Sequence, residues 1–447
     1  MSISLSALKI LKSEFTKALR SKKWLEKLLI GDLYGFEQEL HEWLLGFYDK
    51  ICSAMIKQVS SSIKFEKIQR EISEKRGLKK LSLRSVELQL RTGTKIRYDS
   101  LYAKQVPKGY EGCRHLSHIH WRVDQKSGLM YQSLSCLLSV ICPSFMLSKS
   151  VLNYQGIHAN FDRIRKLSLT MAHHCKENRT KIQIKDGETL AGKRVLIAID
   201  GGRTRMRQYD EENQKGRSAK YTTPWQEPKL FVITTIDKNG KANKEELPIY
   251  DSCFGDDETF EILEQYLKEL EIDKAKDVQF VADGALWIWN RVKPMLTSLG
   301  VKEDKILETL DYYHAMEHLY ELFEYIEKDQ KESISKKLKQ ALWQGDIKKI
   351  KRLVKKGIPG VDLEQFNPYK YFYKNRNRID YQKLRKEKRP CGSGVIESGI
   401  RRIINMRFKC PSTFWYPENV ERLILMRSIA LSGRWETMLN NLTKIRA

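Results

Sequence analysis

The sequence predicts an α/β protein in which a mixed sheet is interrupted by an all-α insertion and preceded by a mainly helical N-terminal region. Two short apolar runs, Val195–Ile199 and Val278–Ala282, are each followed by Asp-Gly. Apolar runs of about five residues with polar borders are typical of strands that are buried on both faces. The pattern divides the chain into a helical basic N-terminal domain (1–80), a small mixed region with a helix pair and a linker (81–190), the first part of the sheet domain (191–314), a basic helical insertion (315–390) and the C-terminal helices (391–447).

The composition indicates a polyanionic partner. The chain has 447 residues, with 81 Lys and Arg against 56 Asp and Glu, which gives a formal net charge of +25. Such an excess favours nucleic acid, although a membrane surface or ribosomal RNA also satisfies it. Because 41% of the residues are hydrophobic, the chain can form real cores, and disorder is excluded.

The cysteines and the apolar runs favour a cytoplasmic protein. Eight cysteines are scattered along the chain without a C-x-x-C pair, which fits a reducing compartment. The first 30 residues lack a signal-peptide core, and the most apolar run, Leu134–Cys142, is far shorter than a membrane span.

The first 80 residues carry apolar residues at helical spacing. The stretch Lys57–Lys80 holds eight basic residues against three acidic ones. Two interpretations are open, a solvated helix face and a contact with the DNA backbone.

The region from 81 to 190 predicts a hairpin and a helix pair. Ser85–Arg91 alternates like a half-exposed strand, Gly93 supplies a turn, and Lys95–Tyr98 returns. Two helices around a turn at Gln155-Gly156 are compatible with a helix-turn-helix, although most helix pairs bind no DNA. The polar stretch Lys176–Gly192 predicts a linker.

A Cys/His cluster lies within this region, at Cys113, His115, His118 and His120. The spacing C-x-H-x2-H-x-H matches no standard zinc finger, so zinc is the less favoured interpretation. Whether the cluster binds zinc stays open from the sequence.

The sheet domain follows an ordered series of strands. After Val195–Ile199 come strands at 230–236 and 247–253, joined by a hairpin-type turn, then a helix at 258–270. The run at 278–282 and a last strand at 306–311 follow, and a helix begins after Tyr312. Three hairpin-connected strands, a helix, and further strands alternating with helices is the order of an RNase H-like sheet.

The insertion is helical in pattern and strongly basic. Between Lys328 and Lys356 there are eleven Lys or Arg against three acids. Aromatic residues among the cations suit base stacking beside phosphate contacts, and equally the packing of a helical domain. A helix with Ser393 as a possible N-cap then carries Glu397 in its first turns.

Three carboxylates form the candidate catalytic constellation: Asp200, Asp283 and Glu397. Asp200 and Asp283 end the two apolar strands, and Glu397 comes from the late helix. Carboxylate oxygens suit Mg²⁺ or Mn²⁺, and two such ions would clamp the attacking and leaving oxygens around a phosphate. The alternative is that each strand-end Asp only caps the following turn.

Four blocks of the sequence stand out together. They are Ile199-Asp200-Gly201, Val281-Ala282-Asp283-Gly284-Ala285 with Trp287, Leu310-Asp311-Tyr312-Tyr313-His314 with Glu317-His318-Leu319, and Gly392-Ser393-Gly394-Val395-Ile396-Glu397-Ser398. In this order they resemble the DDE transposases of bacterial insertion sequences, in the branch akin to eukaryotic Mutator-like elements.

The resemblance implies an RNase H-like core with a helical insertion, and an enzyme that uses bound Mg²⁺ or Mn²⁺ to cut double-stranded DNA at element ends and join it to target DNA. Asp200, Asp283 and Glu397 match the family's catalytic triad and would hold two ions. Two DNA ends must be handled together, which implies a homodimer or a higher multimer.

Five further residues are predicted to position DNA: Asp311, His314, Arg203, Arg401 and Trp343. Asp311 and His314 match the family's D/C-x2-H motif. Arg203 lies in the basic loop after the Asp200 strand, and Arg401 is four residues beyond Glu397, on the same helix face. Trp343 would stack a flipped base, as in related hairpin-forming enzymes, or else belong to the core of the insertion.

Two other functions stay open: a non-catalytic sequence-specific DNA-binding protein derived from a transposase, and an RNase H-like nuclease or resolvase that cuts without joining.

Overall fold

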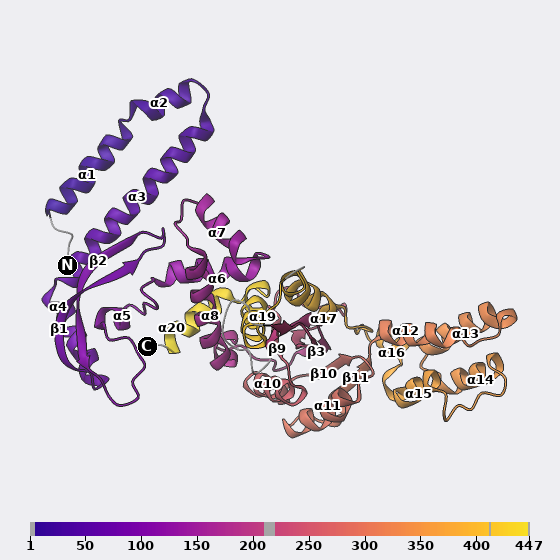
Figure 1. Ribbon diagram of the computed structural model, residues 1–447. Coiled ribbons are helices and arrows are strands. Elements are labelled where there is room, and N and C mark those ends of the chain that lie inside the picture. Colours follow the sequence, from indigo (N-terminus) through magenta and orange to yellow (C-terminus); the bar gives the residue numbers. More distant parts are fainter. Residues whose placement is uncertain (1–4, 210–219, 411–412, 446–447) are drawn as a thin grey trace. The chain divides into compact units, whose positions relative to one another are not determined.

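The computed structural model describes residues 5–209, 220–410 and 413–445 (Figure 1). It divides into two compact units, one of residues 1–171 with 442–447 and one of residues 172–441. The five-segment division stays a prediction. No helix in the described ranges is both long and apolar enough to cross a membrane.

The first unit combines long helices with a two-stranded hairpin. Its elements are α1 (Leu5–Leu19), α2 (Lys22–Leu29), α3 (Leu33–Ser60), α4 (Ile63–Lys75), β1 (Lys79–Gln89), β2 (Lys95–Gln105), α5 (Leu116–His120), α6 (Leu129–Ile141), α7 (Phe145–Tyr154) and α8 (Phe161–Glu177). Figure 1 shows α1 and α2 running back along α3. Trp43 of α3 stacks on Phe47 with ring centroids 4.9 Å apart, and Trp24 of α2 packs edge-on against Trp43.

The predicted hairpin is confirmed and is longer than the sequence indicates. β1 and β2 pair antiparallel over eleven residues each, from Lys79 opposite Gln105 to Gln89 opposite Lys95. The helix pair α7–α8 is present as well.

The predicted linker at 176–192 is wrong. α8 continues to Glu177, and α9 (Arg179–Gln183) follows at once. The buried Arg179 guanidinium lies 3.6 Å from Asp251 and 3.3 Å from Glu421. Gln183 donates to the hydroxyl of Tyr266 (2.7 Å). These polar side chains are buried by partners far along the chain, so local polarity misrepresents their environment.

The second unit is built on a five-stranded mixed sheet, as predicted. The strand order is β11-β10-β3-β8-β9, with β10 parallel to β3 and β11, and β8 antiparallel to β3 and β9. The strands are β3 (Arg194–Gly201), β8 (Lys229–Thr235), β9 (Ile249–Cys253), β10 (Asp277–Ala282) and β11 (Ile306–Leu310). Short two-residue strands, β4 to β7, lie between β3 and β8.

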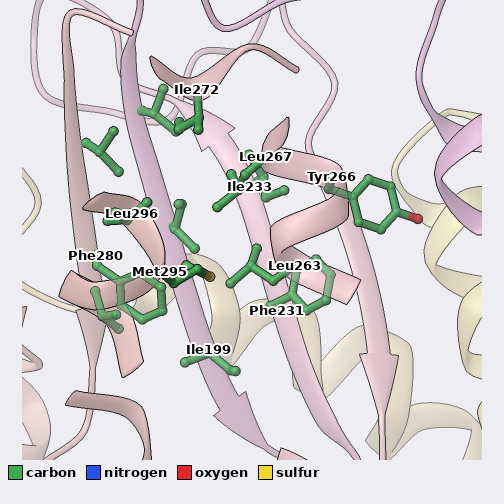
Figure 2. Packing of buried hydrophobic residues seen from close by; sticks show 14 of the residues in the cluster. Ile199, Phe231, Ile233, Leu263, Tyr266, Leu267, Ile272, Phe280, Met295 and Leu296 are labelled. Atoms are coloured by element: carbon green, nitrogen blue, oxygen red, sulfur yellow. The ribbon is translucent and has the colours of Figure 1, made fainter. Parts of the chain in front are cut away.

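One face of this sheet is covered by α10 (Asp256–Glu269) and α11 (Leu286–Ser298). Figure 2 shows Ile199, Phe231 and Phe280 of the strands packed against Leu263 and Met295 of these helices. Burying these side chains contributes roughly 1.5–3 kcal/mol each, which makes the sheet a firm platform for its strand ends.

Where the sequence predicts a helical insertion, the structure has five helices around a core of their own. They are α12 (Tyr312–Phe323), α13 (Lys331–Trp343), α14 (Ile347–Gly357), α15 (Asn367–Lys374) and α16 (Tyr381–Lys386). In α14, Ile350 and Val354 are buried, whereas Lys348, Lys351 and Lys355 are exposed. The basic excess of the insertion therefore lies on its surface.

The C-terminal helices cover the other face of the sheet. α17 (Gly394–Gly399) contacts β3 and β8, and α19 (Pro417–Leu431) contacts β9. A π-helix (Ile400–Asn405) joins α17 to α18 (Met406–Phe408). Arg427 of α19 donates to the Arg402 carbonyl oxygen through Nε (2.9 Å) and Nη2 (2.6 Å), and so satisfies a carbonyl in this wide turn. α20 (Trp435–Ile445) follows.

Candidate catalytic and metal-binding site

Asp200 and Asp283 end neighbouring parallel strands in the same register. β10 pairs with β3 at a constant offset, from Asp277 opposite Arg194 to Val281 opposite Ala198. Continuing this offset by two residues places Asp283 opposite Asp200. Neighbouring strands lie about 4.8 Å apart and residues in register share a face, so the two carboxylates adjoin.

The pair carries the electrostatic signature of two adjacent acids. The pKa of Asp200 is raised to about 6, mainly by burial and also by the neighbouring charge of Asp283. The Gly201 N–H, which donates to Asp200 Oδ1 at 2.7 Å, and the nearby His314 oppose this rise. A cation between the two carboxylates would relieve the strain of holding both ionised.

Both aspartates also hold local turns. Asp283 Oδ1 accepts the Ala285 N–H at 2.9 Å, and the Trp289 indole donates to the Asp283 carbonyl oxygen at 2.6 Å. The turn-capping interpretation is therefore correct for one carboxylate oxygen of each side chain, Oδ1 of Asp200 and Oδ1 of Asp283. Oδ2 of each has no hydrogen-bond partner among the described residues, and remains available to a ligand.

Glu397 is presented to the same face as Asp200. Leu230 lies directly across the strand pair from Asp200. A Cβ on Gly399 would lie 2.7 Å from the Tyr250 ring and 3.3 Å from the Leu230 side chain, so the close packing of α17 on β8 and β9 favours glycine here. Glu397, two residues earlier, is exposed, and its Oε1 accepts the Ser393 hydroxyl at 3.1 Å.

The three acids do not form a finished metal centre. In the described ranges, no group of three or more His, Cys, Asp or Glu side chains lies close enough together to hold a metal ion. The structure therefore brings Asp200 and Asp283 together. Glu397 lies on the same face of the sheet, but not close enough to form a three-carboxylate group with the two aspartates.

Asp311 extends the row of acids to a third strand. β11 pairs with β10 at an offset that places Asp311 opposite Asp283, and the Asp311 N–H donates to the Ala282 carbonyl oxygen (2.8 Å). Its side chain is fully buried. Oδ1 accepts the N–H groups of Tyr313 (2.6 Å) and His314 (3.3 Å), and Oδ2 accepts that of Ser393 (2.7 Å).

Asp311 thus caps α12 and ties down the loop from which α17 starts. Since Ser393 also bonds Glu397, a continuous path runs from Asp311 through Ser393 to Glu397. DNA positioning by Asp311 stays a prediction of the resemblance, whereas these contacts indicate that it positions Glu397.

Replacing Asp311 tests this arrangement. We expect Asp311→Ala to lower the free energy of unfolding by about 2–4 kcal/mol, because a helix cap is lost and the buried Ser393 N–H is orphaned. The matched control is Asp346→Ala, which removes only the cap of α14, a bond to the Lys349 N–H at 2.8 Å, and is expected to cost about 1 kcal/mol. Urea unfolding measures both. Equal losses would contradict the tethering role.

The raised pKa of Asp200 predicts a pH-dependent stability. Below about pH 3 the carboxyl is protonated in both the folded and the unfolded state and costs nothing, whereas above about pH 6 it must ionise in a buried site. Asp200→Asn should therefore match the wild type at about pH 3 and exceed its unfolding free energy by about 3 kcal/mol at about pH 8, as measured by urea unfolding in EDTA. A difference that stays constant with pH would contradict this expectation.

The other four predicted DNA-positioning residues differ in their surroundings. His314 is half-buried, with Nδ1 3.3 Å from Glu317. Arg203 has 73% of its side chain exposed and lies 3.6 Å from Glu227, and Arg401 is exposed in the π-helix. Trp343 packs edge-on against Tyr312, with ring centroids 5.5 Å apart, as part of the core of the insertion. That packing accounts for Trp343, and base stacking by it stays untested.

The Cys/His cluster provides no group of three or more metal ligands within the described residues. His118 is buried beside Tyr98, and burial lowers the pKa of His118 to about 4, so the ring is neutral. His118 and His120 are two residues apart in α5 and therefore point to different sides of the helix. Cys113 Sγ lies 3.7 Å from the His115 carbonyl oxygen.

Tyr371 of α15 reaches the residue that follows Asp283, a position that the aromatic and basic pattern of the insertion does not predict. A Cβ on Gly284 would lie 2.3 Å from the Tyr371 ring, so the glycine after Asp283 makes room for it. The Tyr371 hydroxyl is buried and has no hydrogen-bond partner in the described part of the chain. Burial, and then the charges of Asp283 and Asp311, raise its pKa, so the phenol stays protonated and remains a donor.

Comparisons with known proteins add little. No family model matches the chain, and no curated protein matches it. Among solved structures, the Drosophila P element transposase strand transfer complex is similar over 68% of this chain and 79% of that chain, with 14% sequence identity and a TM-score of 0.26. A likeness at that score is too weak to indicate the function of this chain.

Proposed function

We propose that this protein is a DDE-type DNA transposase, a polynucleotidyl transferase that cuts double-stranded DNA at element ends and joins it to a target. The observation that carries the proposal is the register of Asp200 and Asp283 on adjacent parallel strands, with Glu397 on a helix packed over the same face. Two adjoining carboxylates, with a third acid on the same face, are the kind of ligand set that metal-dependent phosphoryl transfer uses.

The sheet supports an RNase H-like interpretation of the core. Three antiparallel strands in sequence order, β3, β8 and β9, are followed through α10 by β10 and β11, which add in parallel on the other side of β3. The helical insertion between β11 and α17 matches what the bacterial insertion-sequence resemblance implies.

The donor set fits Mg²⁺ or Mn²⁺. Carboxylate oxygens are the ligands of hard cations, and the raised pKa of Asp200 beside Asp283 is what a bound cation would reverse. Asp200 and Asp283 would hold the ions, with Glu397 as the third ligand. When bound, the ions would activate the attacking oxygen and neutralise charge on the scissile phosphate.

The chain's own residues would orient the reaction. Asp311 and Ser393 hold the start of α17, and the exposed side chain of Glu397 is able to turn towards the strand pair. The exposed lysines of the insertion, with Arg203 and Arg401, would contact the DNA backbone. A homodimer or higher multimer would hold two ends.

Incubation with DNA that carries the regions flanking its gene, with and without Mg²⁺, tests the proposal. We expect nicked ends and joined products that require the metal. Nicking without joining would favour the nuclease or resolvase. Binding without nicking would favour the non-catalytic DNA-binding protein, the alternative that the separation of Glu397 from the strand pair supports.

Tyr371 offers a second test of the site. We expect Tyr371→Phe to leave stability unchanged or slightly higher, because an unpaired buried hydroxyl is removed, but to lower metal-dependent cleavage about tenfold through loss of a donor beside Asp283. Tyr381→Phe is the matched control, since its hydroxyl is also buried without a partner in the described ranges. Equal cleavage by the two variants would assign Tyr371 a packing role only.

A further inference from the structure

A second concave site lies in the first unit, in a pocket of about 580 Å³ between the β1–β2 hairpin, the loop before α6 and the start of α8. Four cationic side chains line it, from Lys95, Lys126, Arg163 and Lys166, against one acid, Glu87. Three amide side chains complete the lining. Cations with amide donors are typical of sites that bind phosphate groups.

The charge of the pocket is available to a ligand. Glu87 lies 3.3 Å from Lys95, so its charge is offset within the lining. Lys126, Arg163 and Lys166 have no ion-pair partner among the residues that the structure describes. A net positive, solvent-open pocket therefore faces outward.

Arg163 is held in place before any ligand arrives. Its Nη2 donates to the Ser127 hydroxyl at 2.9 Å, and that hydroxyl donates to Gln89 Oε1, also at 2.9 Å. Ser127 and Gln89 are both buried. A guanidinium fixed by buried partners loses little side-chain entropy on binding.

The loop that carries Lys126 adopts a costly backbone. Gln125 and Lys126 have φ angles of 45° and 61°, in the left-handed region that disfavours side chains. The loop is fixed there by the Gln89 N–H, which donates to the Lys126 carbonyl oxygen at 2.7 Å. Glycine would adopt this conformation without cost, and such strain clusters at ligand-binding positions.

We propose that this pocket binds phosphodiester groups of the DNA backbone, away from the acidic site. The proposal rests on the proposed function for the identity of the polyanion. Lys126 and Arg163 supply the fixed contacts, and Lys166 adds charge at the rim.

Substituting Lys126 by glycine distinguishes the backbone strain at this residue from its contribution to DNA binding. Full-length protein is titrated against a labelled duplex of about 30 bp in EDTA and about 100 mM NaCl, with fluorescence anisotropy as the readout. We expect Lys126→Gly to raise the urea midpoint, because glycine relieves the backbone strain, and yet to weaken DNA binding about five- to tenfold. The dependence of log Kd on log salt should fall by about one.

Lys80→Gly is the matched control. Lys80 is also an exposed lysine of the first unit in the left-handed region, with a φ of 53°, but it lies outside the pocket. We expect its affinity to change less than about twofold. Unchanged affinity in Lys126→Gly, or equal losses in both variants, would overturn the proposal in favour of a diffuse basic surface.

A competition experiment with inorganic phosphate shows whether the pocket binds the DNA backbone or free phosphate. Inorganic phosphate at about 10 mM, with ionic strength matched by chloride, should leave the difference between the two variants intact. Loss of that difference would assign the pocket to free phosphate instead. Since binding is measured without metal, a protein that fails to cleave DNA still tests the pocket.

Discussion

Asp200→Asn, Asp283→Ala and Glu397→Gln are each expected to reduce metal-dependent DNA cleavage by more than about 1,000-fold. Each removes a carboxylate oxygen that would hold a cation at the scissile phosphate, and preorganised charge of this kind is the largest single contribution to such reactions. Because the three acids would act as a unit, a double variant should lose no more than the worst single one.

The matched control for these variants is Asp257→Asn, an exposed carboxylate at the start of α10 with 75% of its side chain accessible. It should cleave like the wild type. Metal-free DNA binding should persist in all four variants, which separates lost chemistry from lost structure. Retention of more than about a tenth of the activity by any of the three acid variants would exclude that residue from the mechanism.

Arg434→Met is expected to lower the free energy of unfolding by about 3–5 kcal/mol. The Arg434 side chain is 1% exposed and forms paired bonds to Glu188, at 2.8 Å from Nη1 and 2.7 Å from Nη2. It also donates to the carbonyl oxygens of Pro248 (2.9 Å), Gln183 (2.8 Å) and Leu247. Removing the guanidinium takes a donor from three carbonyl oxygens at once and leaves the Glu188 carboxylate without its cation, with the Lys185 N–H (2.9 Å) still donating to it.

Two comparisons make the Arg434 test specific. Arg291→Met breaks an ion pair with the exposed Asp257 and should cost less than about 1 kcal/mol. Adding Glu188→Gln to Arg434→Met should recover part of the loss, because the uncompensated carboxylate is removed. Urea unfolding of the four proteins measures all of these values. If Arg434→Met lowers the free energy of unfolding by less than about 1 kcal/mol, water molecules must be able to replace the hydrogen bonds of the guanidinium at little cost in stability.

The strand-end pair was predictable because its determinants are local. Each strand is a short apolar run that ends in Asp-Gly, and the 83-residue separation of Asp200 from Asp283 equals the register offset between β3 and β10. The hairpin β1–β2 was readable for the same reason, from alternation and a glycine turn.

The rest of the site depends on contacts that no local pattern records. Tyr371 reaches Gly284 only because the insertion folds back, and the role of Asp311 follows from a bond to Ser393, 82 residues away. The 176–192 stretch has the polar pattern of a linker because Arg179 and Gln183 are polar, yet their buried partners lie 67 or more residues along the chain. Sequence polarity describes a residue, whereas burial depends on its neighbours.

The π-helix after Glu397 makes this segment sensitive to length rather than to composition. Its wider turn accommodates a surplus residue, and the Arg402 carbonyl reaches Arg427 for that reason. Deleting a single amino acid between Ile400 and Asn405 would convert this turn into a regular α-helix with 3.6 residues per turn. Phe408 would then be rotated by roughly 100° about the helix axis. An insertion or deletion here would therefore rotate α18 relative to α17 about their common axis. Conservative substitutions, which keep the number of residues, would leave the two helices in their present orientation.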